Sequence, residues 1–178
     1  MRNDDDTRNV YLVGLMGAGK TTVGRALAKR LGYRFLDSDH EIEARTGVSL
    51  ATIFEIEGEE GFRKREAQVV ADLAGLKRHV VATGGGAILR TENRQVLHAS
   101  GIVIYLNVPL TTLYERTRHD KKRPLLQVSD PRQKLRELHA QRDPLYREIA
   151  HLIVSGSRIT AQATLNLLIK EMGETWKR

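Results

Sequence analysis

A glycine-rich loop directly after a short apolar strand constrains this chain more than any other feature. Residues 10–13 have the composition of a buried β-strand, and residues 14–21 read Gly-Leu-Met-Gly-Ala-Gly-Lys-Thr. This is a full match to the pattern G-x-x-x-x-G-K-[ST], in which glycines let the backbone curl so that several N–H groups face one polyphosphate. Helical spacing of apolar residues begins at once, over 20–31, so the positive end of a helix would face the same ligand. The order strand, loop, helix predicts a polyphosphate site.

The rest of the chain repeats the alternation of strand and helix. Short apolar runs predict strands at 33–36, 80–82, 102–106 and 151–154. Helical spacing predicts helices between them, at 38–46, 49–58, 61–73, 92–99, 109–118, 131–141 and 160–172. Strands that are apolar on both faces and separated by helices indicate a parallel sheet covered on each side. We expect an α/β fold of three layers, with a five-stranded parallel sheet flanked by helices.

Length and composition narrow the class of protein. The 178 residues suit a single domain over 1–178, and the absence of cysteine excludes disulfide scaffolds, zinc–thiolate sites and cysteine nucleophiles. Apolar runs fall short of the roughly 18 residues of a membrane span, and the polar N-terminus lacks a signal core, so we expect a cytoplasmic protein with no membrane partner. The net charge of +7 could attract nucleic acid, a membrane surface or small phosphorylated molecules. Aromatic residues, at 5%, are too few for a base-stacking surface.

Ligands of parallel sheets bind beyond the carboxyl ends of the strands, so the residues after each strand are candidates for a site. Asp37 and Asp39 follow the second strand, where one carboxylate could hold a metal through water and the other could contact an attacking hydroxyl. The alternative is capping of the next helix by Ser38 or Asp39. The third strand is followed by Thr83 and by glycines 84–86, which mark either a close approach of backbone to ligand or a tight turn. That strand lacks a terminal Asp for magnesium, which leaves Asp37 as the candidate.

Arginines at three places could bind anions. Arg63 begins a predicted helix, Arg123 lies in the polar, basic segment 119–130, and Arg142 follows a predicted helix. Segment 119–130 has the length of a mobile lid, and a transferred phosphoryl group needs positive charge above it. Most arginines of so basic a chain are surface residues, however, and the three charges of 121–123 are a weak signal for nucleic acid.

Two other nucleotide-binding classes fit less well. A GTPase is disfavoured because the D-x-x-G string at 72–75 ends a helix instead of following a strand, and because the chain has no N-K-x-D motif. A dinucleotide-binding loop is disfavoured because Thr22 stands where its third glycine belongs.

Taken together, the motifs resemble the shikimate kinase family, whose members phosphorylate the 3-hydroxyl of shikimate with ATP in the chorismate and aromatic amino-acid pathway. The motifs follow the family order over roughly residues 8–160, and they lie at 14–22, 37–39, 58–63, 83–86, 121–126 and 142–146. The resemblance implies a nucleoside-monophosphate-kinase-like fold. It also implies that ATP and shikimate are the partners, with one Mg²⁺ as cofactor, and that the protein is a monomer that binds no nucleic acid.

The resemblance also assigns roles to residues. Those implied to bind ATP are Gly17, Ala18, Gly19, Lys20, Thr21, Thr22, Arg116, Arg123 and Arg158. Those implied to bind the substrate are Asp39, Arg63, Gly84, Gly85 and Arg142. Thr21 and Asp37 would hold the metal, and the catalytic residues would be Lys20, Asp39 and Arg123.

Two alternatives remain from the residues alone. One is another small-metabolite kinase of the same architecture, such as a gluconate or nucleoside-monophosphate kinase. The combination of Arg63, the glycine triplet and Arg142 counts against it, because that set suits a small hydroxylated carboxylate. The other is a binding module that senses ATP and binds nucleic acid through its basic face, which the low aromatic content disfavours.

Overall fold

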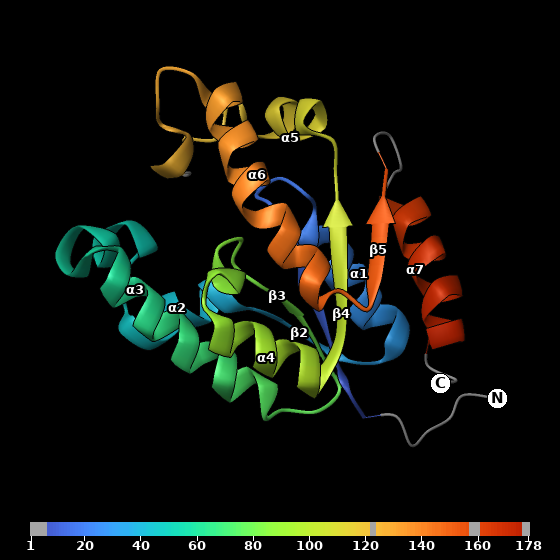
Figure 1. The fold of residues 1–178 in the computed structure, drawn as a ribbon. Coiled ribbons are helices and arrows are strands. Elements are labelled where there is room, and N and C mark those ends of the chain that lie inside the picture. The colour runs from blue at the N-terminus through green and yellow to red at the C-terminus, as the bar shows by residue number, and fades with distance from the viewer. Residues whose placement is uncertain (1–6, 122–123, 157–160, 176–178) are drawn as a thin grey trace.

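One parallel sheet organises the computed structural model, which describes residues 7–121, 124–156 and 161–175 (Figure 1). The five strands lie in the order β2-β3-β1-β4-β5, and every neighbouring pair is parallel. Their bounds are β1 (Asn9–Val13), β2 (Arg34–Asp37), β3 (His79–Ala82), β4 (Gly101–Asn107) and β5 (Leu152–Ser155). The predicted five-stranded parallel sheet is confirmed, and all its carboxyl ends meet at one edge.

Helices cover both faces of the sheet, which gives the three predicted layers. On one face α1 (Lys20–Leu31) packs beside α7 (Ala161–Thr175) (Figure 1). The other face carries α3 (Leu50–Ala74), α4 (Thr91–Ser100) and α6 (Pro131–Ile149), while α2 (Ser38–Thr46) packs on α3 and α5 (Leu110–Thr117) follows β4. Short 3₁₀ turns lie at Ala87–Leu89 and Pro124–Leu126. In the described ranges, no helix is both long and apolar enough to cross a bilayer.

The core lies around the central strand. Every residue of β1 is buried, and the neighbouring β4 is buried from Gly101 to Leu106. Such strands are apolar on both faces because helices cover both, and the removal of this apolar surface from water is the main force that holds the layers together. The two central strands therefore form a rigid base for the residues that follow them.

Two helices differ from the sequence-based prediction. The predicted end of a helix at residue 141 is wrong, because α6 continues to Ile149 with Pro144 inside it. Its buried stripe continues past the proline through Tyr146 and Ile149, and burial of these side chains outweighs the backbone hydrogen bond that proline lacks. Arg142, expected after the helix, therefore lies within it.

The helix break predicted at Gly58 is present as a bend within α3, with no loop between two separate helices. Gly58 has φ 68° and ψ −176° inside the continuous span of α3, so the chain bends there and resumes as helix at once. The bend brings Arg65 within 2.6 Å of Glu57, a spacing of eight residues that a straight helix would keep apart. The shorter part of α3, before the bend, contributes Leu50, Ala51 and Phe54 to the lining of the pocket at the edge where the strands end.

Candidate active site

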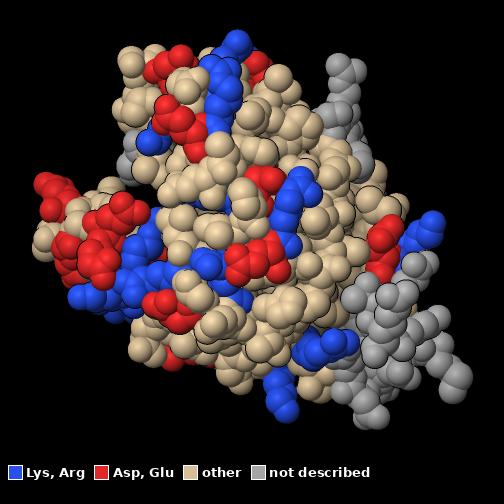
Figure 2. All heavy atoms as spheres, in the orientation of Figure 1, with Lys and Arg blue, Asp and Glu red and all other residues tan. Residues whose placement is uncertain are grey.

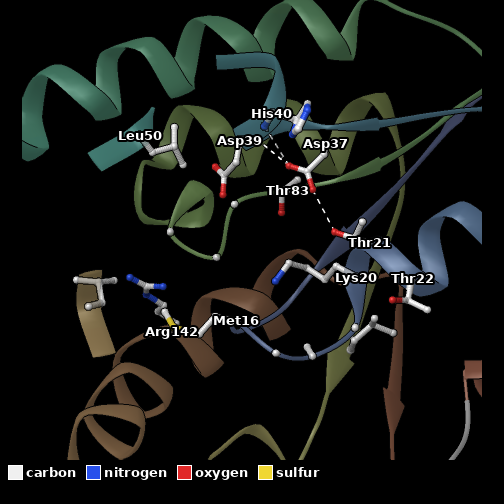
Figure 3. Close-up of a pocket in the computed structure, with 18 of the residues that line it drawn as sticks. Met16, Lys20, Thr21, Thr22, Asp37, Asp39, His40, Leu50, Thr83 and Arg142 are labelled. Atoms are coloured by element: carbon white, nitrogen blue, oxygen red, sulfur yellow. Dashed lines mark hydrogen bonds between the residues drawn. The ribbon is translucent and has the colours of Figure 1, made fainter. Parts of the chain in front are cut away.

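A pocket of about 1040 Å³ lies at the carboxyl ends of the strands. Figure 3 shows three of its charged side chains, those of Lys20, Asp39 and Arg142, around one shared space. The expected site residues that line it are Gly17, Ala18, Gly19, Lys20, Thr21, Thr22, Asp37, Asp39, Arg63, Gly84, Gly85, Arg116 and Arg142. Most of these residues meet here because they lie at or after the carboxyl ends of strands of the same parallel sheet, whereas Arg63, Arg116 and Arg142 come from helices α3, α5 and α6.

The loop between β1 and α1 has the backbone shape that its glycines allow. Gly17 and Gly19 have φ of 81° and 93°, which a residue with a Cβ rarely adopts. Lys20 reaches back over the loop and donates from Nζ to the carbonyl oxygens of Gly14 at 2.7 Å and Leu15 at 3.0 Å. The loop thus carries a positive charge beside the amino end of α1, the arrangement that binds phosphate.

Helix α5 holds this loop from the other side. Arg116 donates from Nη1 to the carbonyl oxygen of Gly17 at 3.0 Å. A Cβ on Gly17 would lie 2.8 Å from Cγ2 of Thr117, so only glycine fits against α5. Arg116 is therefore placed at the rim of the loop, where the resemblance expects a contact with the nucleotide.

Asp37 connects the second strand to the phosphate loop. Its Oδ1 accepts hydrogen bonds from the backbone N–H groups of Asp39 at 3.0 Å and His40 at 3.3 Å, so Asp37 caps α2. Capping by Ser38 or Asp39, the alternative from sequence, is wrong, because Ser38 Oγ instead accepts from the N–H of Gly84 at 2.9 Å. The remaining oxygen of Asp37 accepts from the Thr21 hydroxyl at 3.1 Å.

The oxygens of Thr21 and Asp37 fit a magnesium ion. Mg²⁺ prefers hard oxygen ligands and is often held by one or two protein groups together with phosphates and waters. Thr21 Oγ1 and Asp37 Oδ2 are adjacent at 3.1 Å beside the phosphate loop. Among the described residues, no cluster of three or more His, Cys, Asp or Glu side chains offers an all-protein metal site. The pair therefore suits an ion that arrives with a nucleotide.

Asp39 lies in the first turn of α2, against the glycine triplet. A Cβ on Gly84 would lie 2.5 Å from Asp39 Oδ1, so the triplet allows the carboxylate to approach the backbone closely. The Ala87 N–H donates to the Gly84 carbonyl oxygen at 3.0 Å, so the glycines form the tight turn that was one of the two interpretations, and the close approach to a ligand stays a prediction. Asp39 thus stands between the triplet and the pocket.

Arg63 and Arg142 enter the same pocket from α3 and α6. Both are buried, with 8% and 3% of their surface exposed. Within the described part of the chain, neither buried Nε has a hydrogen-bond acceptor. Buried guanidinium groups that keep an unused donor are costly unless an anion pairs with them. The pair is therefore suited to a carboxylate, which a guanidinium can bind through two parallel hydrogen bonds.

Glu66 is a site residue that the sequence-based reasoning missed. It is 1% exposed, lines the pocket, and its Oε1 accepts from Nη1 of Arg63 at 2.7 Å. Burial raises the pKa of Glu66 to about 7; the Arg63 guanidinium opposes this rise and the Asp39 carboxylate adds to it. A signal was available, because Glu66 falls on the buried stripe of α3 between Phe62 and Val69, where an acid is unexpected.

Two expected nucleotide contacts, Arg123 and Arg158, lie outside the described residues. Within the expected lid, 119–130, the described part includes the 3₁₀ turn Pro124–Leu126, and Leu125 lines the pocket. The roles of Arg123, Arg158 and the lid stay predictions.

Comparison with known proteins identifies the family. The family model described as Shikimate kinase matches residues 16–173. The chain belongs to the shikimate kinase family. Curated shikimate kinases from Dechloromonas aromatica and Burkholderia thailandensis are 62% and 55% identical to it, over 92% and 97% of this chain and 90% and 94% of theirs.

Solved structures agree with this membership. A shikimate kinase from Acinetobacter baumannii, in complex with shikimate, is 51% identical, with a TM-score of 0.92 over 95% of this chain and 94% of its own. A gluconokinase from Sinorhizobium meliloti shares the fold at a TM-score of 0.62, with 18% identity over 95% of this chain and 93% of its own. The predicted resemblance to the shikimate kinase family is confirmed, and the likeness to the gluconokinase extends to the fold alone.

Proposed function

We infer that this chain transfers the γ-phosphoryl group of ATP to the 3-hydroxyl of shikimate. The observation that carries the inference is the pair of buried arginines, Arg63 and Arg142, which line the same pocket as a phosphate loop. A small carboxylate and a polyphosphate are the ligands that these two halves recognise. The curated relatives named as shikimate kinases, and the shikimate in the Acinetobacter baumannii structure, support the same reaction.

The nucleotide half of the site positions and neutralises the phosphates. Backbone N–H groups of 17–22 and the Lys20 ammonium would hold the β- and γ-phosphates, and Thr21 with Asp37 would hold Mg²⁺. When bound, the ion neutralises charge that develops on the phosphoryl oxygens. Phosphoryl transfer needs little covalent chemistry from the protein, so this positioning accounts for much of the catalysis.

The substrate half holds the carboxylate at one end and the reacting hydroxyl at the other. Arg63, Arg142 and the Gly84–Gly85 backbone would bind the shikimate carboxylate. Asp39 would accept a hydrogen bond from the 3-hydroxyl and take its proton as the oxygen attacks phosphorus. Its place against Gly84, with Lys20 and Arg142 around the same space (Figure 3), supports this assignment.

We also propose how the remainder of the chain serves the reaction. The expected lid at 119–130 would close with Arg123 over the phosphates and exclude water, while Arg116 and Arg158 would contact the adenine end of ATP. The link from Arg116 to the phosphate loop supports its assignment. We propose that residues 1–178 form one kinase domain that acts as a cytoplasmic monomer.

The test is turnover of shikimate by the purified protein with Mg·ATP. We expect ADP release with shikimate, and background rates with gluconate and with nucleoside monophosphates. Turnover of one of those controls without turnover of shikimate would overturn the proposal.

A pair of variants tests the role of Asp39. Asp39→Asn should lower kcat by about 10²-fold or more, because a general base contributes that much, and should leave the Kd for ATP within about twofold. Glu41→Gln is the matched control, since Glu41 lies on the same helix but pairs with Arg45 at the surface, and its kcat should stay near wild type. An Asp39→Asn protein that turns over as fast as the Glu41→Gln control would remove Asp39 from the chemistry.

A further inference from the structure

A buried tyrosine lies beneath the glycine triplet. Tyr146, on α6, is 1% exposed, and its hydroxyl donates to the carbonyl oxygen of Gly85 at 2.6 Å. Gly85 and Gly86 line the pocket, whereas Tyr146 is absent from the described residues that do so. The tyrosine hydroxyl lies beside Arg142, because a Cβ on Gly85 would lie 3.7 Å from the Tyr146 hydroxyl oxygen and 3.2 Å from Arg142 Nη1.

This hydrogen bond fixes the direction of a peptide N–H. The C=O and N–H of a trans peptide point in opposite directions, so a Gly85 carbonyl held toward Tyr146 turns the N–H of Gly86, a residue that lines the pocket, away from Tyr146. Among the described residues, neither Gly85 nor Gly86 donates its N–H to an acceptor. The triplet thus presents backbone donors close to Arg63 and Arg142.

Three consecutive glycines would not hold such a direction by themselves. Glycine has the widest choice of backbone conformations, so an unanchored triplet loses most entropy when it orders on a ligand. Gly85 has little room, since a Cβ there would lie 3.2 Å from Arg142 Nη1 and 3.5 Å from the Gly14 carbonyl oxygen. Burial raises the pKa of Tyr146 well above its ordinary value, so its hydroxyl keeps its proton and remains a donor. Other hydrogen bonds hold Gly84 and Gly86, including that of the Gly84 N–H to Ser38 Oγ, and Tyr146 adds the anchor that holds the carbonyl of Gly85.

We propose that Tyr146 is a positioning residue for the carboxylate of the substrate, acting through the Gly85–Gly86 peptide and through Arg142, whose side chain also hydrogen-bonds with that of Tyr146. The proposal rests on the proposed function, because it assumes that shikimate places its carboxylate between the arginines and the triplet. Tyr146 touches no reacting atom, so its loss affects the binding of shikimate and leaves phosphoryl transfer intact.

Two Tyr→Phe variants separate this role from packing. Tyr105 and Tyr146 lie with ring centroids 4.9 Å apart, and the Tyr105 hydroxyl donates to Asp143 at 2.8 Å instead of to the triplet. Tyr146→Phe should raise the KM for shikimate about fivefold, the loss expected for one hydrogen bond, with kcat and the KM for ATP within about twofold. Tyr105→Phe removes one hydroxyl from the same ring pair and should leave the KM for shikimate unchanged.

Three outcomes would overturn the proposal. They are an unchanged KM for shikimate in folded Tyr146→Phe, an equal rise in both variants, and an equal rise in the KM for ATP. If Tyr146→Phe fails to fold, the wild-type protein with ¹⁵N-labelled glycine gives the answer: shikimate should shift the Gly86 amide resonance, and an unmoved resonance would refute the role. Wild-type turnover is measured first, since its absence would overturn the proposed function as well, whereas an active wild type with an unaffected Tyr146→Phe refutes only the positioning role.

Discussion

Two effects act in opposite directions on the pKa of the buried carboxyl group of Glu66. Removal from water favours its neutral form, while the Arg63 guanidinium at 2.7 Å favours the ionised form. Asp39 lies nearby as well, since a Cβ on Gly84 would approach oxygens of both acids, at 2.5 Å for Asp39 and 3.1 Å for Glu66. Burial prevails and the pKa rises to about 7. The folded protein therefore binds a proton at Glu66 more tightly than the unfolded chain does.

The raised pKa of Glu66 makes the free energy of unfolding depend on pH. From pH 4.5, the ordinary pKa, to about pH 7, the unfolded chain has lost the Glu66 proton and the folded protein still holds it. The contribution of Glu66 to the free energy of unfolding is therefore present at low pH and is lost as pH rises through about 7. The glutamine of Glu66→Gln cannot titrate. Between about pH 5 and about pH 8 the free energy of unfolding of the wild type should therefore fall by about 2 kcal/mol more than that of Glu66→Gln.

Urea unfolding of the wild type and Glu66→Gln at both pH values measures this difference. Glu60→Gln is the control, because Glu60 lies on the same helix but pairs with Arg90 at the surface. Equal pH dependence in all three proteins would contradict a raised pKa at Glu66.

The sequence predicted residues at strand ends far better than residues on helix faces. Asp37 ends β2, Asp39 lies just after it, and Lys20 and Thr21 begin the helix after the loop that follows β1, so a parallel topology alone brings them to one edge. Glu66 reaches the pocket only because α3 packs with its buried stripe toward the sheet, and that orientation depends on tertiary contacts. The local pattern of charges along α3 does not contain that information.

At the level of elements, α1 shows how closely a helix packs on the sheet. Gly24 is buried in α1, and a Cβ there would lie 2.6 Å from Phe35 Cε2 and 3.0 Å from Leu12 Cδ1. Glycine is normally unfavourable inside a helix, so its presence here reflects the close contact with β1 and β2. The same helix begins at the phosphate loop, and this contact therefore helps to place the loop.

Gly24→Ala should destabilise the protein by about 1–2 kcal/mol, because overpacking outweighs the gain in helix propensity. Gly173→Ala is the matched control, because Gly173 lies in α7 with no atom within 4 Å of the Cβ position, and that variant should be slightly more stable than wild type. Thermal unfolding of the two variants compares them directly. A Gly24→Ala protein as stable as Gly173→Ala would contradict the packing argument.

Element boundaries were predictable where a glycine ends a helix and less so where tertiary burial prevails. Gly32 and Gly47 end α1 and α2 with φ of 71° and 72°, as their sequence positions indicate. The sequence-based prediction ended α6 at residue 141, yet Tyr146 and Ile149 extend the helix by burying their side chains. Local sequence patterns thus predict the helix ends that a glycine forms, and they miss the end of a helix that buried side chains extend.

For the whole molecule, the charged side chains behind the net charge of +7 lie in different surroundings. On the face drawn in Figure 2, acidic and basic side chains lie beside each other over α3, as in the pairs of Arg65 with Glu57 and Arg90 with Glu60. Arg142 in the pocket is instead 3% exposed and keeps an unused Nε donor in the described part of the chain. Arg142 thus offers a buried positive charge to an anionic substrate, in a pocket whose lining also contains the acidic side chains of Asp37, Asp39, Glu43 and Glu66.

Salt should weaken substrate capture more than turnover. From about 0.05 M to about 0.5 M NaCl the screening length falls severalfold, so the KM values for ATP and shikimate should rise while kcat changes little. Lys64→Gln removes one exposed charge next to Arg63 in sequence and should show the same KM as wild type at low salt. KM values that are independent of salt would contradict electrostatic capture.

The central position of β1 determines when the sheet can close during synthesis. Strand β1 pairs with β3 and β4, which both follow it in the chain, so its second neighbour is complete only when Asn107 has been made. Until then one edge of β1, a strand whose five residues the folded protein buries completely, has no partner strand. The nascent chain must carry this open edge while the residues up to Asn107 are made, and an unpaired apolar strand edge is prone to aggregate.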